Sequence, residues 1–194
     1  MISPPPDSYR RIRDGEVIRI GGHDWEVVTG TGHSPEHACL YDAGRKLLIS
    51  GDQVLPRISS NVSVHPTEPD ADPLGDWLDS LDRLRRRVPD DVLVLPSHNE
   101  PFHGLHARLN QLEAEVLDAL ERLKRGLQEP LRAVDVFPLL FSARLRVDDP
   151  TQLTMATGEA IAHLNHLLIR NEISVTTDPQ GVAWYRGGSW SRDR

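Results

Sequence analysis

Two hairpin patterns in the first 50 residues constrain the fold of this chain more than any other feature. Residues 16–20 (EVIRI) predict a strand, GGHD a turn, and WEVVT a returning strand. Residues 38–42 and 46–50 repeat this arrangement on either side of a turn at DAGR. Apolar runs that flank glycine-containing turns are typical of antiparallel hairpins. We therefore expect the N-terminal part to be built around an antiparallel sheet.

Two helical patterns follow the hairpins. Residues 76–88 place their large apolar side chains on one helix face, and Pro89 ends the pattern. A short apolar strand, DVLVLP, then leads into the loop SHNEPFHG, and residues 105–125 form the longest helical pattern. Residues 53–73, before the first helix, are rich in Pro, Ser and Asp and have no sustained period. A loop of this length is typical of a functional or mobile segment.

The pattern changes after residue 128. RAVDVFPLLF predicts a short helix, residues 150–171 predict a longer one, and ISVTT and VAWYR predict a hairpin around DPQG. A short helix, a longer helix and a two-stranded hairpin together indicate a winged helix. The sequence thus predicts an α+β protein with one domain at 1–105, a connecting helix at 106–128 and a winged-helix domain at 129–194.

Charge and composition exclude some classes of function. The 194 residues carry a formal net charge of −7, of which residues 1–105 contribute −6 and residues 106–194 contribute −1. Neither part has the basic excess with which proteins grip duplex nucleic acid. No apolar run reaches the roughly 20 residues that cross a bilayer, and the N-terminus lacks the apolar core of a signal peptide. The single cysteine, Cys39, fits a reducing compartment. We therefore expect a cytoplasmic protein without a membrane partner, in which Cys39 is buried and inert.

His33, Asp52 and His98 are the candidate metal ligands. Each lies beside an apolar strand pattern, in a loop that contains Gly, Ser or Pro. Strand ends on a rigid sheet are frequent positions for functional side chains, and imidazole with carboxylate suits zinc. Because the three residues are far apart in the sequence, spacing alone leaves a second interpretation open, in which all three are solvated polar groups.

The segments around these residues resemble a known family. TGHSPEHACLYD, LLISGDQVLP and VLPSHNEPFHG are similar to the last three metal-binding motifs of the metallo-β-lactamase-fold hydrolases. The resemblance implies that His33 binds one zinc, that Asp52 bridges two ions and orients the water, and that His98 binds the second ion. It also implies an αββα sandwich and a metal-bound hydroxide that attacks an ester, thioester, lactone or phosphodiester. A C-terminal winged helix occurs in many members of this family.

The sequence departs from the family pattern at its beginning. The first metal motif of the family, His-x-His-x-Asp-His, does not occur, and His23 is the one histidine that precedes His33. Residues 1–105 are thus expected to form the second half of the sandwich, with partial or no metal binding and doubtful activity on its own. An uncovered sheet face favours self-association, so we expect a homodimer. A fragment of a longer gene product is the alternative explanation.

Other functions and other residues remain to be weighed. The winged helix allows a nucleic-acid-binding or regulatory protein, with RNA as an alternative to a small-molecule substrate, and the missing motif allows a catalytically dead remnant. His37 is predicted to support the loop of His33 rather than to bind metal. His103 and His106 could line a pocket but are expected on the solvated surface. His163 and His166 share a helix face and could bind a metal, but they are expected to be packed or surface histidines of the C-terminal domain. Residues 60–73 are a candidate part of the substrate cleft, and the basic run at 83–88 is expected to form the solvated face of its helix.

Overall fold

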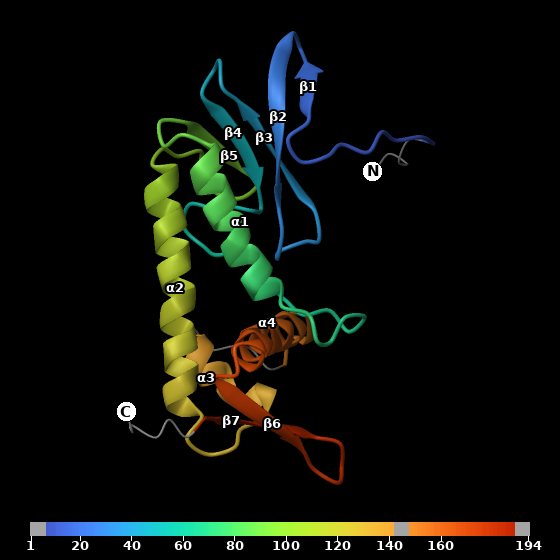
Figure 1. Ribbon diagram of the computed structural model, residues 1–194, viewed down its shortest axis with the longest axis vertical. Coiled ribbons are helices and arrows are strands. Elements are labelled where there is room, and N and C mark those ends of the chain that lie inside the picture. The colour runs from blue at the N-terminus through green and yellow to red at the C-terminus, as the bar shows by residue number, and fades with distance from the viewer. Residues whose placement is uncertain (1–6, 142–147, 189–194) are drawn as a thin grey trace.

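The computed structural model describes residues 7–141 and 148–188. A sheet of five strands, β1 to β5, lies at one end (Figure 1). The strands are β1 (Val17–Ile20), β2 (His23–Gly30), β3 (His37–Asp42), β4 (Leu47–Gly51) and β5 (Leu93–Pro96). Neighbours are antiparallel from β1 to β4, and β5 pairs parallel with β4. Both predicted hairpins and the strand before His98 are therefore confirmed.

Helix α1 (Pro73–Arg87) connects β4 to β5 and covers one face of the sheet. The Asp72 side chain accepts a hydrogen bond from Gly75 N, and Pro73 occupies the first turn, where its missing N–H costs nothing. These two residues start the helix three positions before the predicted residue 76. Its buried side chains pack in one core with those on one sheet face; from the sheet these are Val28, Cys39, Tyr41, Leu48 and Val94.

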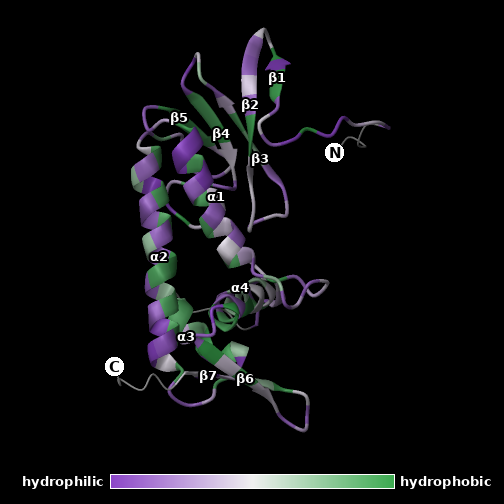
Figure 2. Ribbon diagram, viewed as in Figure 1, coloured by the Kyte–Doolittle hydropathy of each residue, from purple (hydrophilic) through white to green (hydrophobic). Residues whose placement is uncertain are grey.

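The opposite face of the sheet is also apolar. Trp25 and Val27 of β2 are buried on it, but the apolar side chains that the other strands place there are not. Strand alternation places Ile18, Leu40, Leu47, Ile49, Leu93 and Leu95 there. Five of these six are half-buried, Ile49 is 37% exposed, and none belongs to the main core. The apolar character of β4 and β5 is visible in Figure 2. The predicted open sheet face is thus present in the part of the chain that the structure describes.

Helix α2 (Leu105–Gly126) runs from the sheet to the C-terminal elements (Figure 1). These are the 3₁₀ helix η1 (Ala133–Val136), α3 (Phe137–Leu140), α4 (Pro150–Ile169), and the hairpin of β6 (Ile173–Thr177) and β7 (Ala183–Gly187). The predicted short helix is split into η1 and α3, and the longer helix and the hairpin are confirmed. One apolar core extends from the sheet through α1 and α2 to α4 and β7. Among the described residues, no helix has both the length and the apolar character to span a membrane.

Candidate metal centre

The three predicted ligands come together at one edge of the sheet. β2, β4 and β5 run in the same direction, so their carboxyl ends share an edge, and His33, Asp52 and His98 each follow one of these ends. His33 Nε2 lies 3.6 Å from Asp52 Oδ2, and His98 Nε2 lies 3.3 Å from Asp52 Oδ1. Each imidazole therefore faces a different oxygen of one carboxylate.

Asp52 is held in its ionised form. The Ser97 hydroxyl donates a hydrogen bond to Asp52 Oδ1. This hydrogen bond, together with the nearby His33 and His98, holds the pKa of Asp52 below its ordinary value although partial burial opposes the change. A carboxylate with two oxygens turned to two imidazoles has the arrangement of a bridging ligand.

The tautomer of His33 is set by the polypeptide backbone. His33 Nδ1 lies 2.8 Å from the carbonyl oxygen of Asn61, which can only accept, so Nδ1 carries the proton and donates. In the neutral imidazole the lone pair then lies on Nε2, the atom that faces Asp52. Metal-binding histidines are commonly oriented by such a second hydrogen bond. His98 follows β5 in a loop that passes through Asn99, whose φ is +66°, and its side chain is 65% exposed.

His37 supports the loop of His33, as predicted. Its Nε2–H donates to the carbonyl oxygen of Ser50 at 3.1 Å, so that nitrogen is engaged. Burial, with the neighbouring His33, lowers the pKa of His37. The ring packs edge-on to His33, with centroids 6.1 Å apart. Gly51 lies against it with φ of +54°, and a Cβ at Gly51 would lie 2.4 Å from His37 Nε2. The glycine of the SGD motif is thus required both for its conformation and for space.

The donor chemistry suits a metal ion, but the number of donors is small. Nε2 of His33, Nε2 of His98 and the two oxygens of Asp52 are donor types that zinc accepts. Within residues 7–141 and 148–188, however, no group of three or more His, Cys, Asp or Glu side chains is placed to hold one ion. The arrangement is instead two pairs, each of one imidazole and one carboxylate oxygen. A tetrahedral ion at either position would need further donors.

A cleft of 190 Å³ opens beside His33. One wall is the His33 loop, and the other includes Ser63, His65 and Glu68 from the segment that the sequence predicted to line a substrate cleft. The stretch that leads into this segment is tied to α2. Arg108 of α2 donates to the carbonyl oxygens of Leu55 and Ile58, at 2.7 and 2.9 Å.

The remaining histidines lie outside the centre. His103 is exposed, as expected, and His106 is half-buried. Their Nδ1 and Nε2 atoms bond the carbonyl oxygens of Val92 and Val88, at 3.0 and 2.8 Å, so both side chains also brace the chain around β5. His163 and His166 are buried in α4, which is the packed rather than the surface position of the two that the sequence left open.

Sequence patterns missed two residues of the centre, Asn61 and Ser97. Asn61 acts through a backbone carbonyl, which no side-chain motif reveals. Ser97 stands next to His98 in the PSH motif, so its position was a usable signal.

Comparisons with known proteins agree with this geometry. Residues 1–98 match the family described as the metallo-beta-lactamase superfamily, and residues 120–187 match the metallo-beta-lactamase-like C-terminal domain. A beta-lactamase domain protein from Burkholderia ambifaria is 44% identical, with a TM-score of 0.88, over 94% of this chain and 53% of that chain. A metallo-beta-lactamase family protein from Thermus thermophilus is 27% identical, with a TM-score of 0.80, over 95% of this chain and 56% of that chain.

Curated relatives are more distant. An acyl-coenzyme A thioesterase from Gallus gallus is 32% identical over 51% of this chain and 34% of its own length. An atrochrysone carboxyl ACP thioesterase from Cryptosporiopsis sp. is 26% identical over 62% of this chain and 36% of its own length. The chain spans about half the length of the solved structures and about a third of the length of these thioesterases. Its sequence, fold and site together place it in one family: the chain belongs to the metallo-β-lactamase superfamily.

Proposed function

We propose that this chain carries one side of the active centre of a metal-dependent hydrolase. The observation that supports it most is the Asp52 carboxylate between the Nε2 atoms of His33 and His98, with the His33 lone pair directed to the same place. Nε2 of His33, Nε2 of His98 and the Asp52 carboxylate would hold a zinc ion, which would supply a water with a pKa of about 7 and a positive charge for the developing carbonyl oxyanion. Asp52 orients the attacking water, Ser97 fixes Asp52, and the cleft beside His33 receives the substrate.

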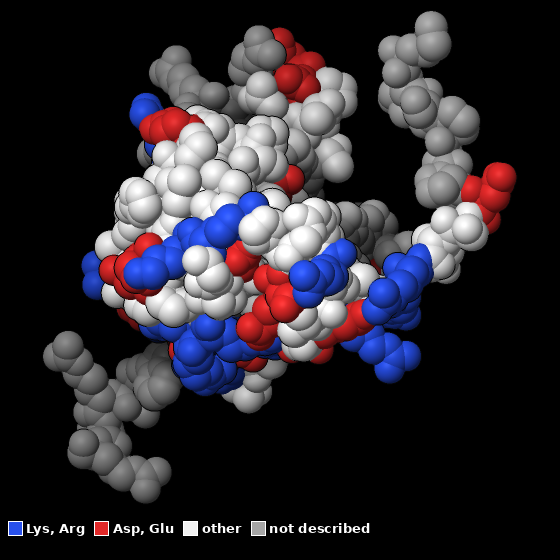
Figure 3. All heavy atoms as spheres, turned by 90° about the horizontal axis from the view of Figure 1, so that it is seen from above, with Lys and Arg blue, Asp and Glu red and all other residues white. Residues whose placement is uncertain are grey.

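The proposed substrate class is a thioester or a related acyl ester. Two of the relatives are named as acyl-coenzyme A and acyl-carrier-protein thioesterases. The surface favours this class over RNA, because basic and acidic side chains are interspersed on the face shown in Figure 3. A winged-helix module at residues 129–194 is then proposed to shape the substrate side of the protein rather than to grip a phosphate backbone. A cytoplasmic location is proposed from the single buried thiol of Cys39.

A homodimer is the proposed form of the protein. The apolar face that contains Leu40, Ile49 and Leu95 is open, and each half of the centre has one imidazole and one carboxylate oxygen. A second copy that packs on this face would bury it. Sedimentation analysis of the wild-type chain and of Ile49→Lys tests this assembly. A wild-type dimer that becomes a monomer in the variant supports it, and a wild-type monomer refutes it.

The test of the centre is metal content per chain after purification without chelators. We expect bound zinc in the wild-type chain, loss of it in His98→Ala, and wild-type content in His23→Ala. His23 is a suitable control because it begins β2, at the opposite end of that strand from the loop of His33. Equal metal content in His98→Ala and wild type would show that His98 is not a ligand.

Thioester hydrolysis can be followed on the same samples by release of a thiol. The protein's own thiol does not interfere, because burial raises the pKa of Cys39 to about 12. Hydrolysis that disappears in His98→Ala supports the hydrolase. Metal binding without hydrolysis of any acyl ester would favour the catalytically dead remnant.

A further inference from the structure

Helix α4, in the C-terminal part of the chain, contacts the segment that orients His33. The Asn61 carbonyl oxygen accepts the hydrogen bond from His33 Nδ1 at 2.8 Å, and the Asn61 side-chain amide donates to Glu159 Oε2 at 2.9 Å. The Met155 carbonyl oxygen is a second acceptor for this amide, but at 3.5 Å it is a weak one. One asparagine thus connects a candidate metal ligand to a carboxyl group of α4.

The side chain and the carbonyl group of Asn61 are both held in place. Ser63 Oγ donates to Asn61 Oδ1 at 2.6 Å, while Asn61 Nδ2 donates to Glu159. Val62, the next residue in the sequence, is 3% exposed and packs in the main core. The carbonyl that bonds to His33 belongs to the peptide group between Asn61 and Val62, so it has little freedom to turn away.

The backbone of α4 approaches the same segment closely at Gly158. Val64 N donates to the carbonyl oxygen of Gly158 at 3.1 Å, so a carbonyl group inside the helix accepts from the loop. A Cβ at Gly158 would lie 2.8 Å from both Cβ and Oγ of Ser63, and 3.2 Å from the oxygen of Val64. Glycine is less favourable than alanine inside a helix, so its presence here fits the need for close approach.

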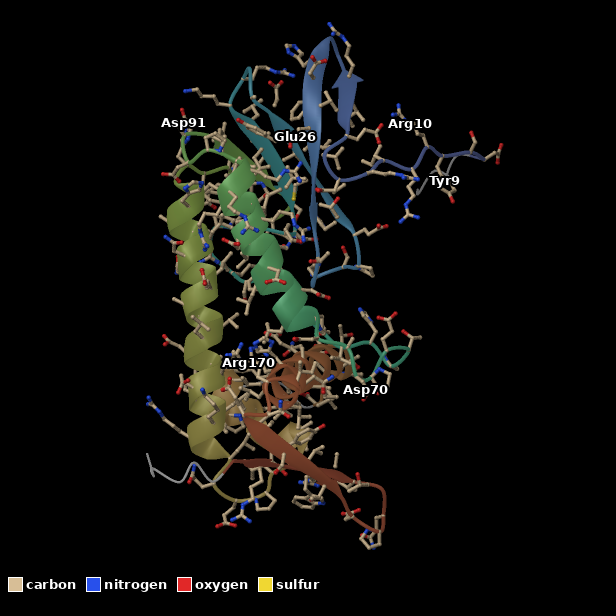
Figure 4. The ribbon with its side chains drawn as sticks, viewed as in Figure 1. Tyr9, Arg10, Glu26, Asp70, Asp91 and Arg170 are labelled. Atoms are coloured by element: carbon tan, nitrogen blue, oxygen red, sulfur yellow. The ribbon has the colours of Figure 1, made fainter. Side chains whose placement is uncertain are left out.

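α4 also holds one wall of the cleft beside His33. Farther along the helix, Asn165 Nδ2 donates to the carbonyl oxygens of Pro69 and Ala71, at 2.8 and 3.0 Å. Asp70, between these two residues in the sequence, lies beside α4 in Figure 4. Ala71 itself lines the cleft. The helix therefore supports the cleft wall as well as the candidate ligand.

We propose that α4 positions the candidate metal centre, with Glu159 as a positioning residue that acts on His33 through Asn61. The inference rests on the proposed hydrolase and adds to it a residue from the C-terminal part of the chain. Glu159 holds the Asn61 side chain, and the Asn61 carbonyl keeps the proton on His33 Nδ1. In the neutral ring the lone pair then stays on Nε2, where a metal ion would bind. Glu159 is two hydrogen bonds away from His33, so its effect is on orientation and not on the reacting atoms.

Nitrogen-15 NMR of the histidine rings in the metal-free full chain tests this role, because the two ring nitrogens show which one carries the proton. At about pH 8.5, some two units above the ordinary pKa of imidazole, wild-type His33 should be the Nδ1–H tautomer. Its signals are identified by their loss in His33→Ala. In Glu159→Ala the ratio of the Nε2–H to the Nδ1–H tautomer should rise by about two- to tenfold, the worth of one hydrogen bond. Glu159→Gln retains an oxygen that can accept from Asn61 and should restore the wild-type signals.

Two controls separate this effect from a general disturbance. His103 is the internal control, because its Nδ1 also bonds a backbone carbonyl, that of Val92 at 3.0 Å, just before β5. Its signals should be the same in all variants. Thr154→Ala is the control for truncation of an α4 side chain, since the Thr154 hydroxyl bonds the carbonyl oxygen of Pro150 in its own helix. This variant should leave the His33 signals unchanged.

Gly158→Ala is a second, independent variant. Alanine favours the helix, but its methyl group meets Ser63, so the segment must move and the His33 signals should shift as they do in Glu159→Ala. His33 signals that are unchanged in both variants, or His103 signals that change together with them, overturn the proposal.

Zinc affinity in a competitive titration adds the functional readout. It should be about tenfold weaker in Glu159→Ala and unchanged in Glu159→Gln. A wild type that binds no zinc, together with the His33 shift in Glu159→Ala, would remove the proposed hydrolase and retain the positioning role. Zinc binding with unchanged His33 signals in Glu159→Ala and Gly158→Ala would do the reverse.

Discussion

Replacement of Glu159 by glutamine provides the sharpest physical test of this structure. Glu159 lies in α4 and lines a cavity of 390 Å³ between α1, α2 and α4. Burial raises the pKa of its carboxyl group from 4.5 to about 7, although the hydrogen bond from Asn61 opposes the shift. The other ionisable groups that line the same cavity are Glu115 and Arg122 from α2 and His163 from α4. Glutamine keeps the size of the side chain and an oxygen that can accept from Asn61, but it never ionises.

The sign and size of the effect follow from the two pKa values. Below about pH 4.5 the carboxyl group is protonated in both the folded and the unfolded chain, so it has no effect on stability. Between about pH 4.5 and pH 7 the unfolded chain loses the proton first, and the free energy of unfolding falls. Above about pH 7 the loss in the free energy of unfolding reaches its full size and no longer changes with pH. A shift from 4.5 to about 7 corresponds to about 3 kcal/mol at 1.36 kcal/mol per pKa unit.

Urea unfolding of wild type and Glu159→Gln at about pH 5 and about pH 8.5 measures this cost. We expect the variant to be less than about 1 kcal/mol more stable at the lower pH, and about 2–3 kcal/mol more stable at the higher one. Burial lowers the pKa of His163 to about 4, so this neighbour is neutral at both values and does not contribute. Asp118→Asn, at an exposed position of α2, is the control and should show no such difference. A stability difference that is the same at both pH values would refute the raised pKa of Glu159.

Three further substitutions test the sheet and the centre. Gly51→Ala should lower the free energy of unfolding by at least about 2 kcal/mol in urea unfolding, because the left-handed conformation alone costs a side chain roughly 1–2 kcal/mol and the added methyl group meets His37. Leu48→Ala, at a fully buried position of β4, should cost about 2–5 kcal/mol in the same assay. Ser97→Ala should weaken zinc affinity in a competitive titration by about 10- to 100-fold, because Asp52 loses the hydrogen bond that fixes it. Unchanged affinity would mean that Ser97 has no such role.

The elements of the fold were largely predictable because each depends on local sequence. The two hairpins were predictable from apolar residues at every second position. Helix α1 was predictable from apolar residues at helical spacing, three of which are the buried Trp77, Leu81 and Leu84. The start of α1 was less predictable. The capping hydrogen bond between Asp72 and Gly75 extends the helix into a Pro- and Asp-rich stretch that resembles a loop.

The three candidate ligands were identifiable from the sequence, and the residues that support them were not. His33, Asp52 and His98 follow strands, and parallel strand directions bring their ends to one edge whatever the connecting lengths. The support of Asn61 depends on how the loop after Asp52 folds back over His33, which contacts with Arg108 determine. The cavity was also beyond prediction, because it forms between segments as distant in the chain as Ser59 and Glu159.

The geometry of Asp52 also bears on how a metal site would be completed. A single ion bound by both imidazoles would require His33 and His98 to face the same carboxylate oxygen, yet they face different ones. Two ion positions, one on each side of the carboxylate, account for this better, and each then needs donors from outside the pairs described. The open apolar face of Leu40, Ile49 and Leu95 belongs to the same sheet whose edge carries the pairs. A layer packed on this face could reach that edge, so completion of the metal site and coverage of the sheet would be two consequences of the one association proposed above.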